Sequence, residues 1–209
     1  MLHTRTILVI FFLLLTFTWL SSSGLLKKVV SSENKEIPSV ELTLLKLKGK
    51  VATVKEYIRE KGFNRRICFL VDMSLPSGQP RFFVYDLLKD TLQNKGLVTH
   101  GRCNETWLEG RKYGNTVGCG CTSLGRYRIG KPYTGKFGLA FKLHGLDKTN
   151  DQAYERFVVL HSHECVPETT VRDEICQSDG CPTVSPGFLS QLEPIIKRSS
   201  RPVLLWIFE

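Results

Sequence analysis

The 209-residue sequence predicts a mainly β domain with a few helices, an α+β fold. Three observations support this class. Short apolar segments rich in β-branched and aromatic residues recur between turns rich in glycine, proline and serine. A helical stripe of apolar residues precedes them, and a second helical stripe is followed by one last apolar strand. The sequence has no internal repeat, so we expect one domain with a short N-terminal appendage.

Residues 1–24 are typical of a secretory signal peptide or a membrane anchor. A positively charged start precedes an unbroken apolar run and a zone of small residues. The apolar stretch extends somewhat further, so residues 7–26 are also long enough to remain in a membrane uncleaved. Residues 25–39 are polar and resemble a tether. We therefore expect an exported protein of the periplasm or cell envelope.

Residues 40–61 carry the first helical stripe, whose apolar members are Leu42, Leu45, Val51, Val54, Tyr57 and Ile58. Gly62 provides a stop signal. We expect this helix to pack on a domain that occupies residues 62–209.

The predicted strands follow the helix. We expect them at 67–73, 81–86, 97–99, after Gly125, and at 137–143, 157–160 and 203–208. A turn at 76–78 joins the first two, and a glycine- and asparagine-rich loop fills 100–121. The last strand is wholly apolar, which predicts a central place in the sheet. Before it, Ser185 and Pro186 begin a helix that Pro194 should kink or split.

The formal net charge of +9 favours anionic envelope polymers or acidic peptide groups as partners over nucleic acid. The basic residues are scattered, with only short pairs such as Arg65-Arg66 and Lys197-Arg198. An ordinary solvated surface is the alternative explanation. We expect a monomer.

Seven cysteines in an oxidising compartment permit up to three disulfides and leave at least one thiol unpaired. A bond between Cys165 and Cys176 would hold the loop that precedes Cys181. Cys119 and Cys121 are too close to pair with each other without strain, so each needs a distant partner or stays reduced.

A zinc site is the metal-binding alternative for these cysteines. Its ligands would be Cys119, Cys121, Cys165, Cys176 and His163. The tight CxC spacing differs from the usual spacing of zinc ligand pairs. We expect neither a metal nor a cofactor.

Cys181 follows Gly180, lies downstream of His161 and His163, and is a candidate nucleophile. A thiol with an ordinary pKa of about 8.5 attacks well at neutral pH only when an imidazole takes its proton. Glycine permits a tight turn whose N–H groups can bind an oxyanion. With a period of two, His161 and His163 share a strand face, so either could be the base. The alternative is a bridged Cys181 in a non-catalytic, disulfide-stabilised envelope-binding module.

Several separated motifs resemble one known family. Residues 122–129, Thr-Ser-Leu-Gly-Arg-Tyr-Arg-Ile, are similar to the T-P-x-G-x-[FY]-x-I signature of L,D-transpeptidase (YkuD-like) catalytic domains, with Ser123 in place of the proline. Ser178-x-Gly180-Cys181 resembles the nucleophile motif, and His161-Ser162 the histidine motif. The resemblance extends to the murein L,D-transpeptidase catalytic-domain subfamily and covers residues from about 62 to 209.

The resemblance implies an L,D-transpeptidase-like β-sandwich or barrel with an N-terminal helix and a C-terminal helix and strand. It also implies a peptidoglycan stem tetrapeptide as substrate, cut before its terminal D-alanine through a thioester at Cys181. His161 would act as base, the Ser162 carbonyl would orient its imidazole, and N–H groups around Gly180 would hold the oxyanion. An amine from a second stem would complete a cross-link, whereas water would make the enzyme an L,D-carboxypeptidase.

The residues expected to line the substrate cleft are His163, Ser178, Asp179, Thr183 and Tyr133. Asp179 stands where many members of the family have histidine. Pro182-Thr183 replaces an aliphatic residue followed by Arg or Asn. These departures bear on which substrate is accepted.

Overall fold

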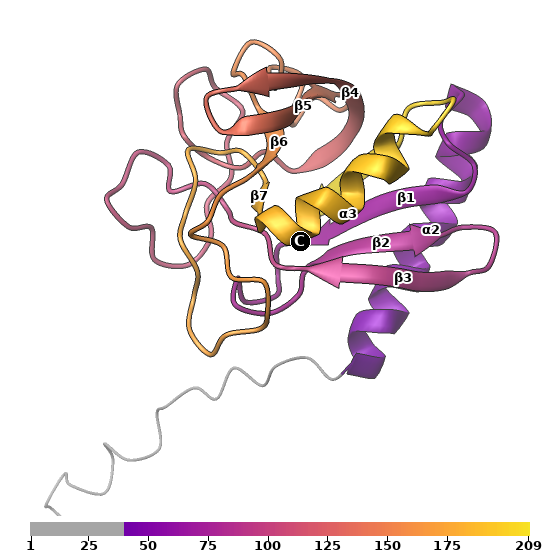
Figure 1. Cartoon of the computed structure of the whole chain (residues 1–209), viewed down its shortest axis with the longest axis horizontal. Helices are drawn as coiled ribbons and strands as arrows, with labels where there is room; N and C mark the ends of the chain where they lie inside the picture. Colours follow the sequence, from indigo (N-terminus) through magenta and orange to yellow (C-terminus); the bar gives the residue numbers. More distant parts are fainter. Residues whose placement is uncertain (1–39) are drawn as a thin grey trace, which may run out of the picture. The chain divides into compact units, whose positions relative to one another are not determined.

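The computed structural model describes residues 40–209, so the predicted leader, the possible anchor at 7–26 and the tether lie outside the described residues. No helix within 40–209 is long and apolar enough to cross a membrane. The elements of this part, shown in Figure 1, are α2 (Val40–Lys61), β1 (Ile67–Asp72), β2 (Phe82–Asp86), β3 (Thr91–Gly96), β4 (Gly125–Gly135), β5 (Gly138–Gly145), β6 (Val159–Ser162), β7 (Thr183–Val184), α3 (Pro186–Lys197) and β8 (Leu204–Phe208).

The strands of the described part form one eight-stranded sheet in the order β3-β2-β1-β8-β4-β5-β6-β7. The β1–β8 and β6–β7 pairs are parallel and the others antiparallel. The mainly β class, with an N-terminal helix and a C-terminal helix and strand, is therefore confirmed. The apolar strand β8 lies between β1 and β4 as expected, because its side chains can be buried on both faces of the sheet.

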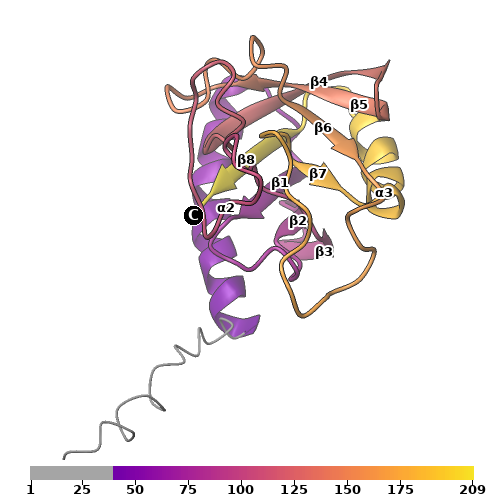
Figure 2. The same cartoon turned by 90° about the vertical axis from the view of Figure 1, so that its left-hand side faces the viewer.

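The two helices cover opposite faces of the sheet (Figures 1 and 2). On one face, α2 buries Leu47, Val51, Val54 and Ile58 with Cys68, Leu70, Phe83 and Leu204. On the other, α3 buries Phe188, Leu189 and Leu192 with Phe69, Phe82, Tyr127 and Phe141. Alternate residues of β1 thus enter two different cores, which explains why this strand is buried along its whole length.

The prediction of a strand at 97–99 is wrong. The strand is β3, Thr91–Gly96, a polar segment at the edge of the sheet with alternately exposed side chains. The sequence of β3 is polar and carries no apolar pattern that would predict a strand, because an edge strand buries few of its side chains. Leu97 and Val98 are buried but belong to an extended segment outside the sheet that leads into the site described below.

Helix α3 begins as predicted, with Ser185 Oγ accepting the Phe188 N–H at 3.2 Å and Pro186 at the first helical position. Of the kink or split expected at Pro194, the split does not occur. Pro194 lies in the last turn of the continuous helix Pro186–Lys197, where one missing N–H costs little against the buried apolar face.

Candidate active site

A pocket of about 420 Å³ brings together three parts of the described chain. These are the tip of the β4–β5 hairpin, the end of β6, and the turn before β7 with the segment beside it. The lining residues include Thr99, Arg102, Trp107, Phe137, His161, His163, Ser178, Asp179, Cys181 and Thr183. The volume lies within the range of about 300–1,000 Å³ typical of small-ligand sites.

Gly180 and Cys181 form the turn that enters β7. Gly180 has φ +105°, and a Cβ at this position would lie 2.6 Å from the Cys121 carbonyl oxygen. Both facts require glycine here. The Cys181 thiol is not in a disulfide, and its Sγ accepts the Val159 N–H at 3.5 Å.

The segment from Val98 to Arg102 runs beside this turn and anchors it. The Thr99 N–H donates to Thr183 O, the Ser178 N–H to His100 O and the Arg102 N–H to Ser178 O, each at 2.9 Å. Within the turn, Ser178 Oγ donates to Cys181 O at 2.7 Å and accepts the Gly180 N–H at 3.2 Å. The nucleophile candidate is thus held by backbone contacts on both sides.

The anchoring segment is itself held by Arg81, which is fully buried. Its guanidinium donates to Val98 O at 2.7 and 2.9 Å and to Leu75 O at 3.1 Å. Its Nη2 also lies 3.2 Å from His100 Nδ1. Burial lowers the pKa of Arg81 to about 9. These contacts link β2 to the Cys181 turn through a buried polar connection.

The His161 imidazole is held from three directions. Its Nδ1 lies 3.0 Å from Ser162 O, and because a carbonyl only accepts, Nδ1 carries the proton. Its Nε2 then accepts from Thr183 Oγ1 at 3.1 Å. The Phe137 ring stacks on it with centroids 4.8 Å apart. Burial lowers the pKa of His161, so the imidazole is neutral at neutral pH with a basic Nε2 in the pocket.

His163 differs from His161 in both exposure and bonding. It is exposed, and its Nδ1 accepts the Cys165 N–H at 3.1 Å. Its ring packs edge-on against Phe137 at 5.8 Å. The lone pair of His163 Nδ1 is taken by a backbone N–H of its own turn, whereas His161 Nε2 accepts from a side-chain hydroxyl that can rotate away, which favours His161 as the available base.

No hydrogen bond joins Cys181 Sγ to either histidine within residues 40–209. Burial raises the pKa of the Cys181 thiol, opposed by the Val159 N–H and the charge of Arg156, while Asp179 raises it further. The resting pair is accordingly a neutral thiol and a neutral imidazole. Such contacts often tighten only when substrate binds.

Arg156 is a functional candidate that sequence reasoning missed. Its guanidinium donates to Gly114 O at 2.9 Å, to Cys121 O at 2.5 Å and to Ser123 Oγ. Its Nη2 lies 3.2 Å from where a Gly180 Cβ would be. It forms no salt bridge with any described residue, and its positive charge lowers the pKa of Cys181 against the effect of burial. It follows no motif and lies in an irregular segment, so the sequence offered no signal.

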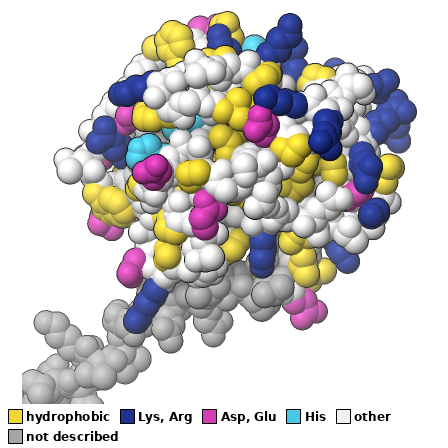
Figure 3. Space-filling view, in the orientation of Figure 1, with side chains coloured by type: hydrophobic (Ala, Val, Ile, Leu, Met, Phe, Trp, Pro, Cys, Tyr) yellow, Lys and Arg dark blue, Asp and Glu magenta, His cyan; other side chains and the backbone are white. Residues whose placement is uncertain are grey.

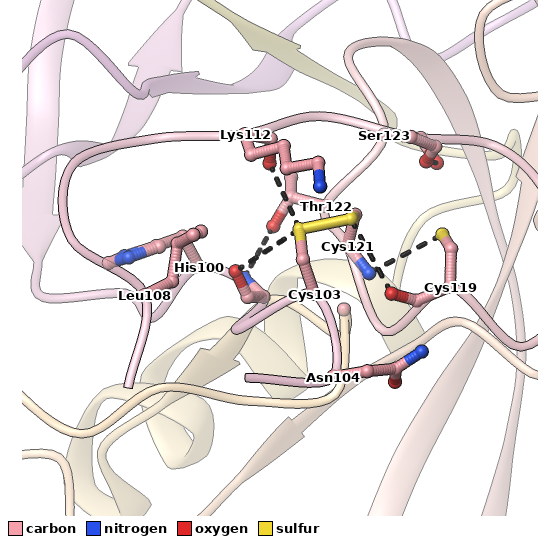
Figure 4. Close-up of a disulfide and its surroundings, with 12 residues drawn as sticks. His100, Cys103, Asn104, Leu108, Lys112, Cys119, Cys121, Thr122 and Ser123 are labelled. Atoms are coloured by element: carbon pink, nitrogen blue, oxygen red, sulfur yellow. Dashed lines mark hydrogen bonds between the residues drawn. A yellow bond between two sulfur atoms is a disulfide. The ribbon is translucent and has the colours of Figure 1, made fainter. Parts of the chain in front are cut away.

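Two disulfides brace the loops around the pocket. The predicted Cys165–Cys176 bond is confirmed, and both of its residues line the pocket. Figure 4 shows the second bond, Cys103–Cys121, with the free Cys119 beside it. Because Cys121, Cys165 and Cys176 are oxidised, the zinc ligand set considered above is not available.

The other predicted site residues divide between two pockets. Ser178, Asp179 and Thr183 line the pocket with Cys181, and Asp179 makes an exposed ion pair with Arg102 at 2.8 Å. Tyr133 instead lines a separate pocket on the β4–β5 hairpin. No group of three or more His, Cys, Asp or Glu that could hold a metal occurs among the described residues.

Comparison with known proteins gave one family match. The model of the L,D-transpeptidase catalytic domain (YkuD_2) matches residues 39–206. No curated protein matches the chain.

Solved structures similar to this chain include the helical cell shape determining protein Pgp2 from Campylobacter jejuni, with 13% identity and a TM-score of 0.45, covering 69% of this chain and 48% of that one. An L,D-transpeptidase from Xylanimonas cellulosilytica has 12% identity and a TM-score of 0.37, covering 74% and 69%. The chain spans about half the length of Pgp2.

Proposed function

This chain belongs to the L,D-transpeptidase catalytic-domain family, and on that premise we propose that it is a transpeptidase with Cys181 as nucleophile and His161 as base. The family acts on peptidoglycan stem peptides. We propose a stem tetrapeptide as donor, and residues 62–209 as the catalytic domain with α2 packed against it.

One observation carries this proposal. Cys181 and His161 line the same pocket, and the Ser162 carbonyl holds the His161 tautomer that leaves Nε2 basic. This is the role that the resemblance implies for Ser162. It supplies the base that a buried thiol with a raised pKa requires.

The chemistry follows from these groups. The Cys181 thiol must first replace the Thr183 hydroxyl as the hydrogen-bond partner of His161 Nε2. As Cys181 Sγ then attacks the amide carbonyl carbon, the thiol proton passes to His161 Nε2. The Gly180 N–H is engaged by Ser178 Oγ, so we assign the oxyanion to the Cys181 N–H. When the C–N bond breaks, the Nε2 proton goes to the leaving D-alanine amine and a thioester remains.

The acceptor decides the product. An amine from a second stem attacks the thioester, gives its proton to His161 and regenerates the Cys181 thiol with a new cross-link. Water in the same place yields a free carboxylate instead. The two disulfides fit an oxidising compartment, which supports export to the periplasm or cell envelope.

The test is D-alanine release from disaccharide tetrapeptides by the purified protein. We expect Cys181→Ala to abolish release and Cys119→Ala, which removes another partly exposed free thiol, to retain it. We also expect His161→Gln to reduce release far more than His163→Gln. Equal release by Cys181→Ala and the unaltered protein would refute the assignment. Mass analysis for cross-linked dimers separates transpeptidation from hydrolysis.

A further inference from the structure

A second pocket, of about 970 Å³, lies between the β4–β5 hairpin and the segment that follows α3. Its cationic side chains come from distant parts of the chain: Arg128, Lys131, Lys142, Lys197 and Arg201. No Asp or Glu is among its lining residues. Lys197 pairs with Glu193, and the other four form no salt bridge with any described residue. The pocket therefore carries largely uncompensated positive charge.

The positive charge of this pocket affects the pKa of His144, which lies within it. The pKa of His144 is lowered, first by burial and then by the charges of Arg128 and Lys142. In the face seen in Figure 3, Lys and Arg side chains gather toward the upper right, where few Asp or Glu side chains lie. An anion entering the pocket would be attracted on electrostatic grounds.

Two aromatic rings give the pocket a second chemical character. Tyr133 and Tyr154 both line it and are 37% and 47% exposed. Lys142 Nζ lies over both rings, 5.9 and 4.9 Å from their centroids, and the His144 ring stacks on Tyr154 at 5.1 Å. Lys142 and His144 cover part of these rings, and the part of each ring that stays exposed is amphipathic surface that a sugar ring can contact.

The concavity is built into the strands. The β4–β5 register shifts between Ile129 and Pro132, which marks a bulge. Gly130 lies in this bulge, and a Cβ there would be 2.9 Å from His144 Nε2. A larger residue at 130 would collide with the imidazole, so the glycine allows His144 to lie close to the strand.

We propose that this pocket binds an anionic glycan, a chain of sugar rings bearing carboxylates, and that its occupant is a denuded stretch of the peptidoglycan glycan strand, where removal of stem peptides leaves the lactyl carboxylates free. Cations for the carboxylates and aromatic faces for the sugars are both present. The choice of peptidoglycan as source rests on the proposed function. The β4–β5 hairpin would then contact both strand and stem peptide, because it supplies Tyr133 to this pocket and Phe137 to the active-site pocket.

The test measures binding of amidase-treated glycan strands to the Cys181→Ala protein by calorimetry. These strands carry a lactyl carboxylate on alternate sugars and no stem peptide, so they report this pocket whether or not Cys181 is the nucleophile. We expect them to bind more tightly than chito-oligosaccharides of equal length, which lack the carboxylates, and than polyglutamate, which lacks the sugars. Binding should weaken as salt increases.

Matched variants locate the binding. We expect Lys131→Gln with Arg201→Gln to weaken it about two- to thirty-fold, at the usual strength of two exposed ionic contacts. The control is Lys48→Gln with Lys61→Gln, two exposed cations of α2, which alters the net charge equally and should leave affinity unchanged. Both double variants should keep the urea unfolding transition of the unaltered protein, which shows that the substitutions leave the fold intact. Equal weakening in the two pairs would overturn the proposal in favour of a net-charge effect.

The sugar contact is tested separately. We expect Tyr154→Ala to weaken binding of the strands and Tyr154→Phe to preserve it, because phenylalanine keeps the ring face. Polyglutamate that binds as tightly as the strands, or a Tyr154→Ala protein with unchanged affinity, would show that sugars are not recognised and would overturn the glycan assignment.

Discussion

The change Gly180→Ala tests the geometry of the Cys181 turn. The backbone at Gly180 has φ +105°, where a side chain costs about 1–3 kcal/mol. The new Cβ would also lie 2.6 Å from Cys121 O and 3.2 Å from Arg156 Nη2. The carbonyl is backbone, so relieving this contact requires the turn or the 119–123 segment to move, at a further cost of about 1–3 kcal/mol. We expect the free energy of unfolding to fall by about 2–6 kcal/mol in total.

Gly118 serves as a control that separates the cost of the backbone conformation from the cost of the close contact. Gly118 also has a positive φ, +79°, but a Cβ there would meet nothing within 4 Å. Gly118→Ala should therefore lose only about 1–2 kcal/mol, the cost of the left-handed conformation. Urea unfolding under non-reducing conditions gives both values.

The second readout is alkylation of Cys181 in a Cys119→Ala background, where the remaining free thiol, Cys68, is buried. Gly180→Ala should change the alkylation rate because the turn moves, and Gly118→Ala should not. If both variants lose the same free energy and alkylate at the unaltered rate, the close approach at Gly180 does not shape the site.

Three further predictions concern neighbouring groups. Phe137→Ala should raise the pKa of His161 toward its ordinary value in an NMR titration, because burial lowers that pKa and the stacked ring is removed; a further decrease would contradict this. Arg81→Met should reduce the free energy of unfolding in urea by about 2–4 kcal/mol, because it leaves buried carbonyls without donors, and an unchanged value would show that they find other partners. Arg156→Gln should raise the pKa of Cys181 further, so alkylation at a given pH slows and its pH profile shifts upward; Arg156→Lys should shift it less, and equal shifts would rule out a role for charge.

Much of the fold could be predicted because its buried elements carry either periodic apolar patterns or continuous apolar runs. Helix α2, strands β1 and β2 and the central strand β8 all follow this rule. The edge strand β3 could not be found, since its residues are stabilised by backbone pairing with β2 rather than by burial. The apolar Leu97 and Val98 led to the wrong prediction of a strand at 97–99, because their side chains are buried although their backbone lies outside the sheet.

The candidate site likewise contains residues that the sequence predicts and residues that it does not. Cys181 and His161 stand out because their chemistry and motifs are visible in the sequence. The position of Thr183 at His161 Nε2 depends on the parallel pairing of β6 with β7, which opposes His161 to Thr183. The stacking of Phe137 and the contacts of Arg156 depend on how a hairpin and a loop fold back, which local sequence does not encode.

The central place of β8 has a consequence for how the molecule is made. β8 pairs with β1 and β4, although β1 lies near the start of the described chain and β8 at its end. A growing chain that lacks residues 204–208 exposes two unpaired strand edges in place of a finished core, and such edges favour aggregation. Folding must therefore wait for the last strand, and its rate should be slow because the decisive pairing is long-range.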